Sequence, residues 1–441
     1  MGEATRIMMK KMLVIAALVA TCIALPVAAA APVSSTWYRT WGTARDESAT
    51  AICGNGTSIY VVGSQGNTWS DTIRLVLVKW DFNGTRLYDT SWGTLDEDVF
   101  PAASAWCDAS TVYTCGYVET EISGHYDDLF LVKWNATGEL LWNRTWGTEM
   151  DDQAMASWSD GGDVVYVCVD VDTISGSRDD DMVLMKVDKD GNSIWNRTVN
   201  YSPADDHAAA AWGLGADVYT FGVTERSWYA HDYLLVKWNS SGDIVWNRTW
   251  DCGDANEDIA SCMWGDSSAI YTCGRTTSGS QSIPTIVKWD HAGNVIWAKT
   301  YPSWRITSVT SIWGDDTGIY IAGSSYDEDR GYDIYVYKLD RDGGDAWQRS
   351  WGTPHPGVES ASTILVSGDD LFTAGYTHTR VNYDDELLVV KWGTDGAAPQ
   401  APDYADAVTG LSIYLTVSNV AAVTAILIVR KRKKGIQPGK R

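Results

Sequence analysis

The sequence predicts an all-β fold, a seven-bladed β-propeller of four-stranded antiparallel blades. First, a Lys-Trp element (Lys-Val or Lys-Leu in two repeats) and a Tyr/Phe-x-x-Gly element (without its glycine in one repeat) each recur seven times, at intervals of about 50 residues. Second, short runs rich in Val, Ile, Tyr and Trp lie between turn residues, which is typical of antiparallel strands. Third, the first recognisable strand, residues 36–41, has no partners before it, whereas the last repeat lacks a fourth strand.

Each repeat is expected to contain four strands. The third strand ends in a lysine, at Lys79, Lys133, Lys186, Lys237, Lys288, Lys338 and Lys391. In the second repeat this strand is apolar at consecutive positions, from Leu129 to Val132, so both of its faces must be covered. Blades packed between neighbouring blades meet that requirement, and a repeated four-stranded unit of this length is the signature of a β-propeller.

The two ends of the repeat region are expected to pair with each other. Strand 36–41 is expected to supply the missing fourth strand of the last repeat, which closes the ring by strand pairing and leaves no long exposed edge. The propeller is therefore expected to span residues 36–396.

The repeats resemble the SBBP-type β-propeller repeats of prokaryotic cell-surface proteins. The resemblance rests on Trp-Gly-x3–5-Asp/Glu, Tyr-x-x-Gly, and Asp-x-Leu-Val-Lys-Trp followed by Asp/Asn-x-x-Gly-x3-Trp, and it covers essentially the whole region between the termini. It implies a seven-bladed fold and no established chemistry. The Asp/Asn-x-x-Gly-x3-Trp portion, Asp290 to Trp297 for example, is also similar to the tryptophan-docking turns of quinoprotein dehydrogenases. Those enzymes have eight blades and a vicinal cysteine pair, and this chain has neither.

The two termini predict export and anchoring. Residues 1–30 have the basic start, apolar centre and Ala-rich end of a signal peptide. A polar stretch, 397–410, is expected to be a stalk. Residues 411–429 carry no charge and precede a basic tail, 430–441, so we expect one transmembrane helix with a cytoplasmic C-terminus. The propeller would then lie outside the cell.

Charge and sequons agree with that location. The chain carries a formal net charge of −23 although both of its ends are basic, so the region between them is strongly acidic. Such a surface repels phosphate backbones and excludes nucleic acid as a partner. Candidate glycosylation sites are Asn55, Asn83, Asn135, Asn143, Asn196, Asn200, Asn239 and Asn247.

The cysteines indicate neither a zinc ribbon nor a redox pair, because no two of them form a Cys-x-x-Cys motif. An odd number remains after removal of the signal peptide. Cys115, Cys168 and Cys273 share one repeat position that holds Val, Phe or Ala elsewhere, so we interpret them as small buried hydrophobic residues. The disulfide pairing stays open.

Acidic and aromatic residues gather in the loops after the second and fourth strands, which lie on the same face of a propeller. The candidate ligand-binding residues there are Asp127, Asp128, Asp180, Asp181, His231, Asp232, Asp384 and Asp385. Carboxylates suit a cationic ligand or Ca²⁺, the one cofactor that these loops suggest, and aromatic rings suit a sugar. The alternative is that the repeated acid is a turn or cap residue, which duplication has copied into every repeat. No ligand spacing singles out a metal site.

The recurrent lysines are expected to make a repeated structural salt bridge. They end the third strand, near the loops after the first strand, which carry Asp108, Asp163, Asp217, Asp266, Asp315 and Asp369.

The sequence therefore favours a membrane-anchored extracellular platform that binds a protein or glycan, with no catalytic residue identified. The alternative is an extracellular hydrolase or lyase acting on polysaccharide, since carboxylates that could act as a pair are abundant. An enzyme requires carboxylates drawn together in one or two blades, whereas a binding platform can spread its contacts round the ring.

Overall fold

The structure, a computed structural model, describes residues 36–400 except 44, 67–71, 94–97, 121–125, 173–179, 228–229, 254–256, 279–280, 307–308, 328–330, 354–356, 379–383 and 394–395. The regular elements of this part are β-strands. None of its segments forms a helix of the length and hydropathy needed to cross a bilayer. The predicted signal peptide 1–30, transmembrane helix 411–429 and tail 430–441 lie outside the described residues, as does most of the stalk 397–410.

The strands form five separate four-stranded antiparallel sheets and one eight-stranded sheet. The larger sheet consists of two four-stranded antiparallel sets. They are joined only by a short parallel contact, in which Gly331 and Tyr332 pair with Gly357 and Val358. In each four-stranded set, three strands follow one another along the sheet in chain order, as the turn residues predicted.

The strands fall into four classes by their position in the sheet. The innermost strands are β2 (Glu47–Gly54), β6 (Val99–Cys107), β10 (Asp152–Ser159), β14 (Asp206–Leu214), β18 (Asp258–Gly265), β22 (Ser311–Asp315) and β26 (Gly357–Ser367). The second strands are β3 (Ser58–Gln65), β7 (Thr111–Thr120), β11 (Val164–Asp172), β15 (Asp217–Ser227), β19 (Ile270–Ser278), β23 (Gly318–Asp327) and β27 (Asp370–His378). The third strands are β4 (Arg74–Asp81), β8 (Tyr126–Asn135), β12 (Asp180–Asp188), β16 (Ala230–Trp238), β20 (Gln281–Trp289), β24 (Gly331–Leu339) and β28 (Asp385–Trp392). The outermost strands are β5 (Arg86–Trp92), β9 (Leu140–Trp146), β13 (Ser193–Val199), β17 (Ile244–Trp250), β21 (Val295–Thr300), β25 (Asp345–Trp351) and β1 (Trp37–Trp41).

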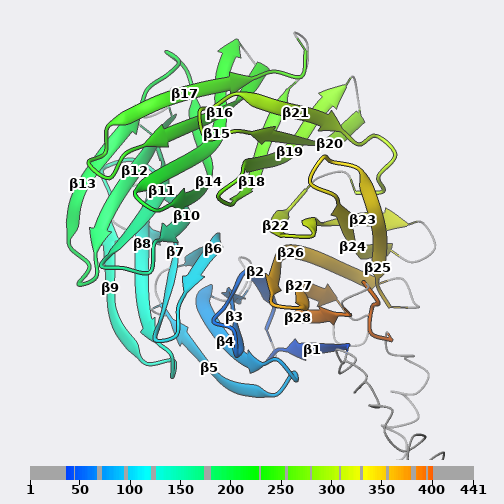
Figure 1. Cartoon of the computed structure of the whole chain (residues 1–441). Helices are drawn as coiled ribbons and strands as arrows, with labels where there is room; N and C mark the ends of the chain where they lie inside the picture. Colours follow the sequence, from blue (N-terminus) through cyan, green and yellow to red (C-terminus); the bar gives the residue numbers. More distant parts are fainter. Residues whose placement is uncertain are drawn as a thin grey trace, which may run out of the picture. The chain divides into compact units, whose positions relative to one another are not determined.

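The sheets are arranged around a central channel, with neighbouring sheets face to face (Figure 1). The innermost strands β2, β6, β10, β14, β18, β22 and β26 all line this channel, whose volume is about 340 Å³. Sheets that radiate from a channel in this way define a β-propeller.

Burial within each sheet follows from its two neighbours. The third strands are buried at consecutive positions, Leu75 to Val78 in β4 for example, because an adjacent sheet covers each of their faces. The tryptophan of the Lys-Trp element is fully buried, and its indole N–H donates to a threonine of the second strand, as from Trp238 Nε1 to Thr220 Oγ1 at 3.0 Å. The outermost strands are mostly exposed.

The Asp/Asn-x-x-Gly turn after each third strand docks onto the preceding sheet. In the turn after β12, Gly191 has a φ of 84°, and a Cβ there would meet the side chains of Trp142 and Arg144 in β9. Trp142 Nε1 also donates to the carbonyl of Lys189 at 2.9 Å. These turns therefore hold neighbouring sheets together.

The recurrent lysines serve the same junctions. Lys237 pairs with Asp217 at 2.7 Å, as expected, and Lys391 pairs with Asp370 rather than Asp369. Most of the others donate instead to a backbone carbonyl in the docked turn of the next sheet, as Lys79 Nζ does to Ala136 at 2.8 Å. The same pattern joins Lys133 to Lys189, Lys186 to Ser240 and Lys288 to Arg341. The expected salt bridge is thus wrong for these lysines, because carboxylates such as Asp108 accept hydrogen bonds within their own loop.

Each lysine also lies over the ring of the Tyr-x-x-Gly element, at 4.7 Å for Lys79 and Tyr60. We therefore expect Lys79→Met, which keeps the apolar stem, to lower the free energy of unfolding by about 2 kcal/mol. Urea unfolding followed by circular dichroism measures this change. Lys189→Met is the control, since Lys189 is exposed and makes only a surface ion pair with Asp163, and we expect it to cost no more than about 0.5 kcal/mol. Equal losses in the two variants would contradict a role for Lys79 at the sheet junction.

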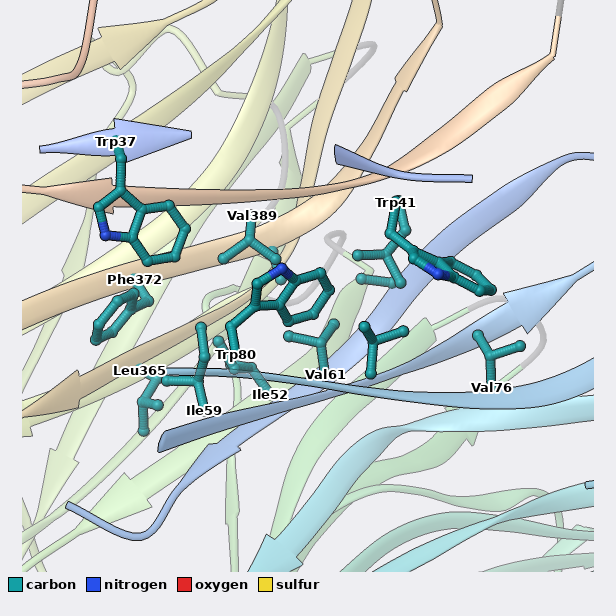
Figure 2. Close-up of a cluster of buried hydrophobic side chains, with 14 residues drawn as sticks. Trp37, Trp41, Ile52, Ile59, Val61, Val76, Trp80, Leu365, Phe372 and Val389 are labelled. Atoms are coloured by element: carbon teal, nitrogen blue, oxygen red, sulfur yellow. The ribbon is translucent and has the colours of Figure 1, made fainter. Parts of the chain in front are cut away.

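Strand β1 closes the ring, as the sequence predicted. It pairs antiparallel with β28 over its whole length, from Trp37 opposite Lys391 to Trp41 opposite Leu387. Both tryptophans are buried in a cluster that joins the last sheet to the first (Figure 2). In that cluster Phe372 and Val389 of the last sheet lie near Trp80 and Val61 of the β2–β5 sheet. Trp37 Nε1 also donates to the carbonyl of Phe82, at 3.1 Å, in the turn after β4.

The described cysteines comprise one disulfide, three buried free thiols, and the partly buried free thiols of Cys252 and Cys262. Cys115, Cys168 and Cys273 are buried free thiols, which confirms their interpretation as small core residues; burial raises the pKa of Cys115 to about 12. Cys53 and Cys107 form a disulfide between the adjacent inner strands β2 and β6, with their Cα atoms 5.9 Å apart. This pairing covalently links two neighbouring sheets.

Candidate functional site

The face formed by the loops after the second and outermost strands carries many acids, and most of the repeated ones are structural. The acid at the start of an inner strand is buried and accepts hydrogen bonds from the preceding loop. Glu47, for example, accepts the N–H of Thr43 at 3.0 Å, and Asp258 accepts that of Cys252 at 3.1 Å. The same buried position holds Asp152, Asp206 and Glu359. These carboxylates are caps, as one of the two sequence interpretations proposed.

The acid just before the cap also has a structural role, since it bridges two sheets. Asp46 Oδ1 accepts the N–H of Asp385 at 3.1 Å, and Asp151 Oδ1 accepts that of Asp127 at 3.0 Å. Asp98 and Asp205 make the equivalent contacts to Ile73 and Asp180. Each acid thus receives a backbone N–H at the start of the third strand of the preceding sheet.

The structure separates most of the predicted ligand-binding residues from one another. Asp127 and Asp128 lie in β8, where Asp127 Oδ2 accepts a hydrogen bond from Gln153 Nε2. Asp384 and Asp385 lie at the start of β28, and Asp385 pairs with His378 at 2.8 Å.

The other four predicted residues come from two adjacent sheets. Asp180 and Asp181 begin β12, and Asp181 is buried. His231 and Asp232 lie in β16. Of all eight residues, Asp180 and His231 are brought into one cluster.

That cluster is centred on His207, in β14. Its Nδ1 atom lies 3.0 Å from Asp170 Oδ2 and 3.4 Å from Asp180 Oδ2. Its Nε2 atom lies 3.8 Å from Asp205 Oδ2. The rings of His207 and His231 have centroids 6.2 Å apart. We call Asp170, Asp180, Asp205, His207 and His231 the His207 cluster.

Three members of the His207 cluster depart from the repeat. The residue after the capping acid is Ser48 in β2, Gln153 in β10, Ile259 in β18 and Ser360 in β26, but it is His207 in β14. Asp170 lies four residues after the Tyr of its repeat, where other sheets have Ser64, Tyr117, Val223 and Ser324. His231 takes the place that Asp127, Asp180 and Asp385 take in their own sheets. Because these residues are not needed to build a sheet, their convergence indicates a site.

Asp170 and His207 were absent from the sequence-based set of ligand residues. Alignment of the seven repeats could have found them, because at each of these two positions the other repeats carry a different residue. No sequence signal places them together, because they meet across the junction of two sheets.

The electrostatics of the cluster are strongly perturbed. The hydrogen bond that His207 Nδ1 donates to Asp170 raises the pKa of His207 to about 9, although burial works in the opposite direction. Burial, followed by repulsion from Asp170, raises the pKa of Asp180 to about 6. The pKa values of both groups are thus raised, and strongly perturbed groups within a few ångströms of each other are typical of functional sites.

A pocket of about 340 Å³ adjoins the cluster. Its polar lining is Asp170, His207, His231, Glu257 and Asp258, and its apolar lining includes Met155, Val223 and Ile259. Glu257 Oε1 lies 3.8 Å from His231 Nδ1. The pocket is therefore lined by both charged and aliphatic groups, which suits a small polar ligand or the end of a larger one.

A second acidic group lies close by and already has a cation. Asp232, Asp251 and Asp258 have carboxylate oxygens within 4.8 Å of one another. The Arg226 guanidinium lies 2.7 Å from Asp251 and 3.7 Å from Asp232. Arg226 therefore offsets part of the negative charge of this group and already contacts two of its three carboxylates.

No protein-family model matches the chain, and no curated protein matches its sequence. The similarity to SBBP-type repeats thus stays a prediction beyond the β-propeller fold itself.

Several solved structures are similar at low identity. The β-propeller domain of the trilobed protease from Pyrococcus furiosus has 11% identity and a TM-score of 0.47, over 83% of this chain and 98% of that one. The polysaccharide lyase Uly1 has 8% identity and a TM-score of 0.49, over 78% and 90% of the two chains. The acylaminoacyl peptidase of Pyrococcus horikoshii has 11% identity and a TM-score of 0.48, over 83% and 54%. Likenesses of this degree say nothing about which molecule the chain binds.

Proposed function

We propose that the chain is a seven-bladed β-propeller on the cell surface that binds an extracellular glycan or protein through the pocket beside His207. The seven repeats and the two-residue contact within the eight-stranded sheet support this blade count, since that sheet then comprises two blades. The signal-like residues 1–30 and the apolar residues 411–429 support export and anchoring. The exposure of Asn143 and Asn196, on outermost strands, is compatible with glycosylation.

The observation that carries the binding proposal is the convergence of non-repeat residues on one pocket. A platform that held its ligand evenly round the ring would repeat its contact residues, whereas Asp170, His207 and His231 each occur in one repeat only. The carboxylates and imidazoles can bind hydroxyl or amine groups, and Met155, Val223 and Ile259 can cover the apolar face of a sugar ring or side chain.

The test is to block the pocket without altering the cluster. Ile259→Trp fills the pocket, and we expect it to abolish the binding of any glycan or extracellular protein that a glycan array or surface-capture screen finds for the wild-type protein. Ile296→Trp is the matched control, since Ile296 is an exposed residue of the outermost strand β21. Undiminished binding by Ile259→Trp would exclude this pocket as the binding site.

A second candidate function is a polysaccharide hydrolase or lyase. It is favoured by the raised pKa of Asp180, about 6, because a carboxyl group that holds its proton near neutral pH can act as a general acid. Incubation with extracellular polysaccharides, followed by assay of reducing ends and unsaturated products, tests this activity. An activity that Asp180→Asn abolishes while binding is kept would favour the enzyme over the platform.

A further inference from the structure

We propose that Asp205, His207 and His231 form a binding site for a divalent transition-metal ion of the Zn²⁺ class, with one coordination position open to the adjacent pocket. The protein ligands would be Asp205 Oδ2 and one imidazole nitrogen of each histidine. The three residues each offer a ligand atom, and these atoms lie within 4.8 Å of one another. Three protein ligands with an open fourth position are the usual arrangement of reactive zinc sites. This inference deepens the proposed function. The role that we give the metal rests on the proposed function, whereas the binding of the metal does not.

The geometry round His207 assigns its two nitrogens to different tasks. Nδ1 is 3.0 Å from Asp170 Oδ2, a hydrogen-bond distance, whereas Nε2 is 3.8 Å from Asp205 Oδ2, which is beyond it. A tetrahedral ion with ligands at about 2.0 Å holds those ligands about 3.3 Å apart. A small movement of Asp205 toward the imidazole would therefore let both groups bind one ion, while Nδ1–H donates to Asp170.

Both histidines have a carboxylate behind them. Asp170 faces Nδ1 of His207, and Glu257 faces Nδ1 of His231 at 3.8 Å. Asp170 is within hydrogen-bond distance, so it can orient the His207 ring and increase its basicity toward a metal, as the partners of metal-binding histidines do. Glu257 lies near His231 but beyond hydrogen-bond distance. The paired arrangement leaves the Nε2 atom of each ring available.

Asp205 provides a separate observation. It is only 7% exposed, its Oδ1 atom receives the N–H of Asp180, and its Oδ2 atom faces His207 Nε2 at 3.8 Å. A buried carboxylate oxygen that faces an imidazole nitrogen in this way is well placed to bind a cation together with that nitrogen.

The ligand types select the kind of metal. Two imidazoles and one carboxylate favour Zn²⁺ or Co²⁺, whereas Ca²⁺ prefers a shell of oxygen ligands. The Ca²⁺ suggested by the acidic loops is therefore not the ion that we assign to this position. The group of Asp232, Asp251 and Asp258 does not suit this class of metal, since it offers carboxylates only and Arg226 already contacts two of them.

The pocket defines the open position. His207 and His231 line the pocket of about 340 Å³, but Asp205 does not, so the ion would have protein on one side and the pocket on the other. A ligand with a carboxylate or another oxygen donor could then bind the metal directly while its remaining atoms contact Ile259 and Val223.

The test measures metal binding to the untagged, EDTA-treated, full-length protein. We expect one Zn²⁺ per chain by isothermal titration calorimetry, and a visible absorption spectrum of tetrahedral type with Co²⁺. His231→Ala and Asp205→Asn should each abolish stoichiometric binding. Asp170→Asn, which weakens only the orientation of His207, should reduce the affinity by about 10-fold to 100-fold.

Two controls make the result specific. His378→Ala removes a histidine that also pairs with an aspartate on the same face, in another sheet, and it should bind Zn²⁺ as the wild type does. Cys252→Ser removes a partly exposed thiol that could bind zinc adventitiously, and it too should leave binding unchanged. Circular dichroism confirms that each variant is folded. A further variant, His207→Ala, should also lose binding, and His231→Ala supplies the decisive comparison if His207→Ala fails to fold.

The outcomes separate this inference from the proposed function. Absence of Zn²⁺ and Co²⁺ binding by the wild type, binding of Ca²⁺ alone, or equal binding by His231→Ala would overturn the metal site and leave His207 as a structural cation among its carboxylates. Ile259→Trp should still bind Zn²⁺ even where it blocks the larger ligand. Metal binding without any glycan or protein ligand would overturn the proposed function alone.

Discussion

Replacement of both Trp37 and Trp41 by alanine is expected to lower the free energy of unfolding by about 6 kcal/mol or more, the largest effect of any change considered for this protein. Both side chains are buried in the cluster between β1, β28 and the β2–β5 sheet. Truncation of a buried tryptophan costs about 3–5 kcal/mol, and a typical domain is stable by only about 5–15 kcal/mol. The double variant should therefore release β1 and expose the edge of β28.

Urea unfolding followed by far-ultraviolet circular dichroism measures the loss, and limited proteolysis detects the released strand. Ile194→Ala combined with Ile296→Ala is the control, because both isoleucines are about half exposed on outermost strands. Each of these changes should cost no more than about 0.5 kcal/mol. If the tryptophan variant lost no more than the control, β1 would have no part in holding the ring closed.

The second large effect is expected from Glu359, a fully buried cap at the start of β26. Its carboxylate accepts the N–H and the hydroxyl of Thr353, at 3.3 and 3.1 Å, and the hydroxyl of Thr377 at 3.2 Å. Glu359→Ala leaves these donors without an acceptor inside the protein, so we expect a loss of about 3 kcal/mol. Glu359→Gln retains an acceptor oxygen and should lose about 1 kcal/mol.

The pH dependence separates these two variants further. Burial raises the pKa of Glu359 above its ordinary value of 4.5, although hydrogen bonds from Thr353 and Thr377 partly offset it. The folded state therefore holds this proton more tightly than the unfolded state, and the contribution of Glu359 to stability falls as the pH rises from 4.5 through the folded-state pKa. Glu359→Gln has no such titration, so the stability of the wild type relative to this variant should decrease across that range. A difference independent of pH would show that Glu359 is not perturbed.

The repetition of the sequence made most of the fold predictable. The Lys-Trp and Tyr-x-x-Gly elements mark the third and second strands of every sheet, and the unpartnered strand at 36–41 predicted its pairing with β28. The sequence did not predict the correct hydrogen-bond partners of most of the recurrent lysines. It shows carboxylates near Lys79 and Lys133, but it cannot show that a turn of the next sheet presents a backbone carbonyl to each of them.

The candidate site was harder to predict for a related reason. Asp180 and His231 were named because they stand in acidic loops, and so were Asp127 and Asp385, whose contacts are structural. What distinguishes the first pair is that both lie beside His207, which Asp170 and Asp180 reach from the neighbouring sheet. Such contacts depend on how two sheets face each other, and residue type and spacing within one repeat carry no information about that.

The closure of the ring also bears on how the protein is made. Asp46 accepts a hydrogen bond from Asp385, 339 residues later, and Lys391 reaches back 309 residues to Phe82. Because synthesis proceeds from the N-terminus, β1 is the first of the strands to leave the ribosome, and its pairing partner β28 is the last to be translated. Throughout that interval the nascent chain carries an unpaired apolar strand at its leading end. The strand that closes the finished ring, β1, is thus the strand most in need of protection by a chaperone during synthesis.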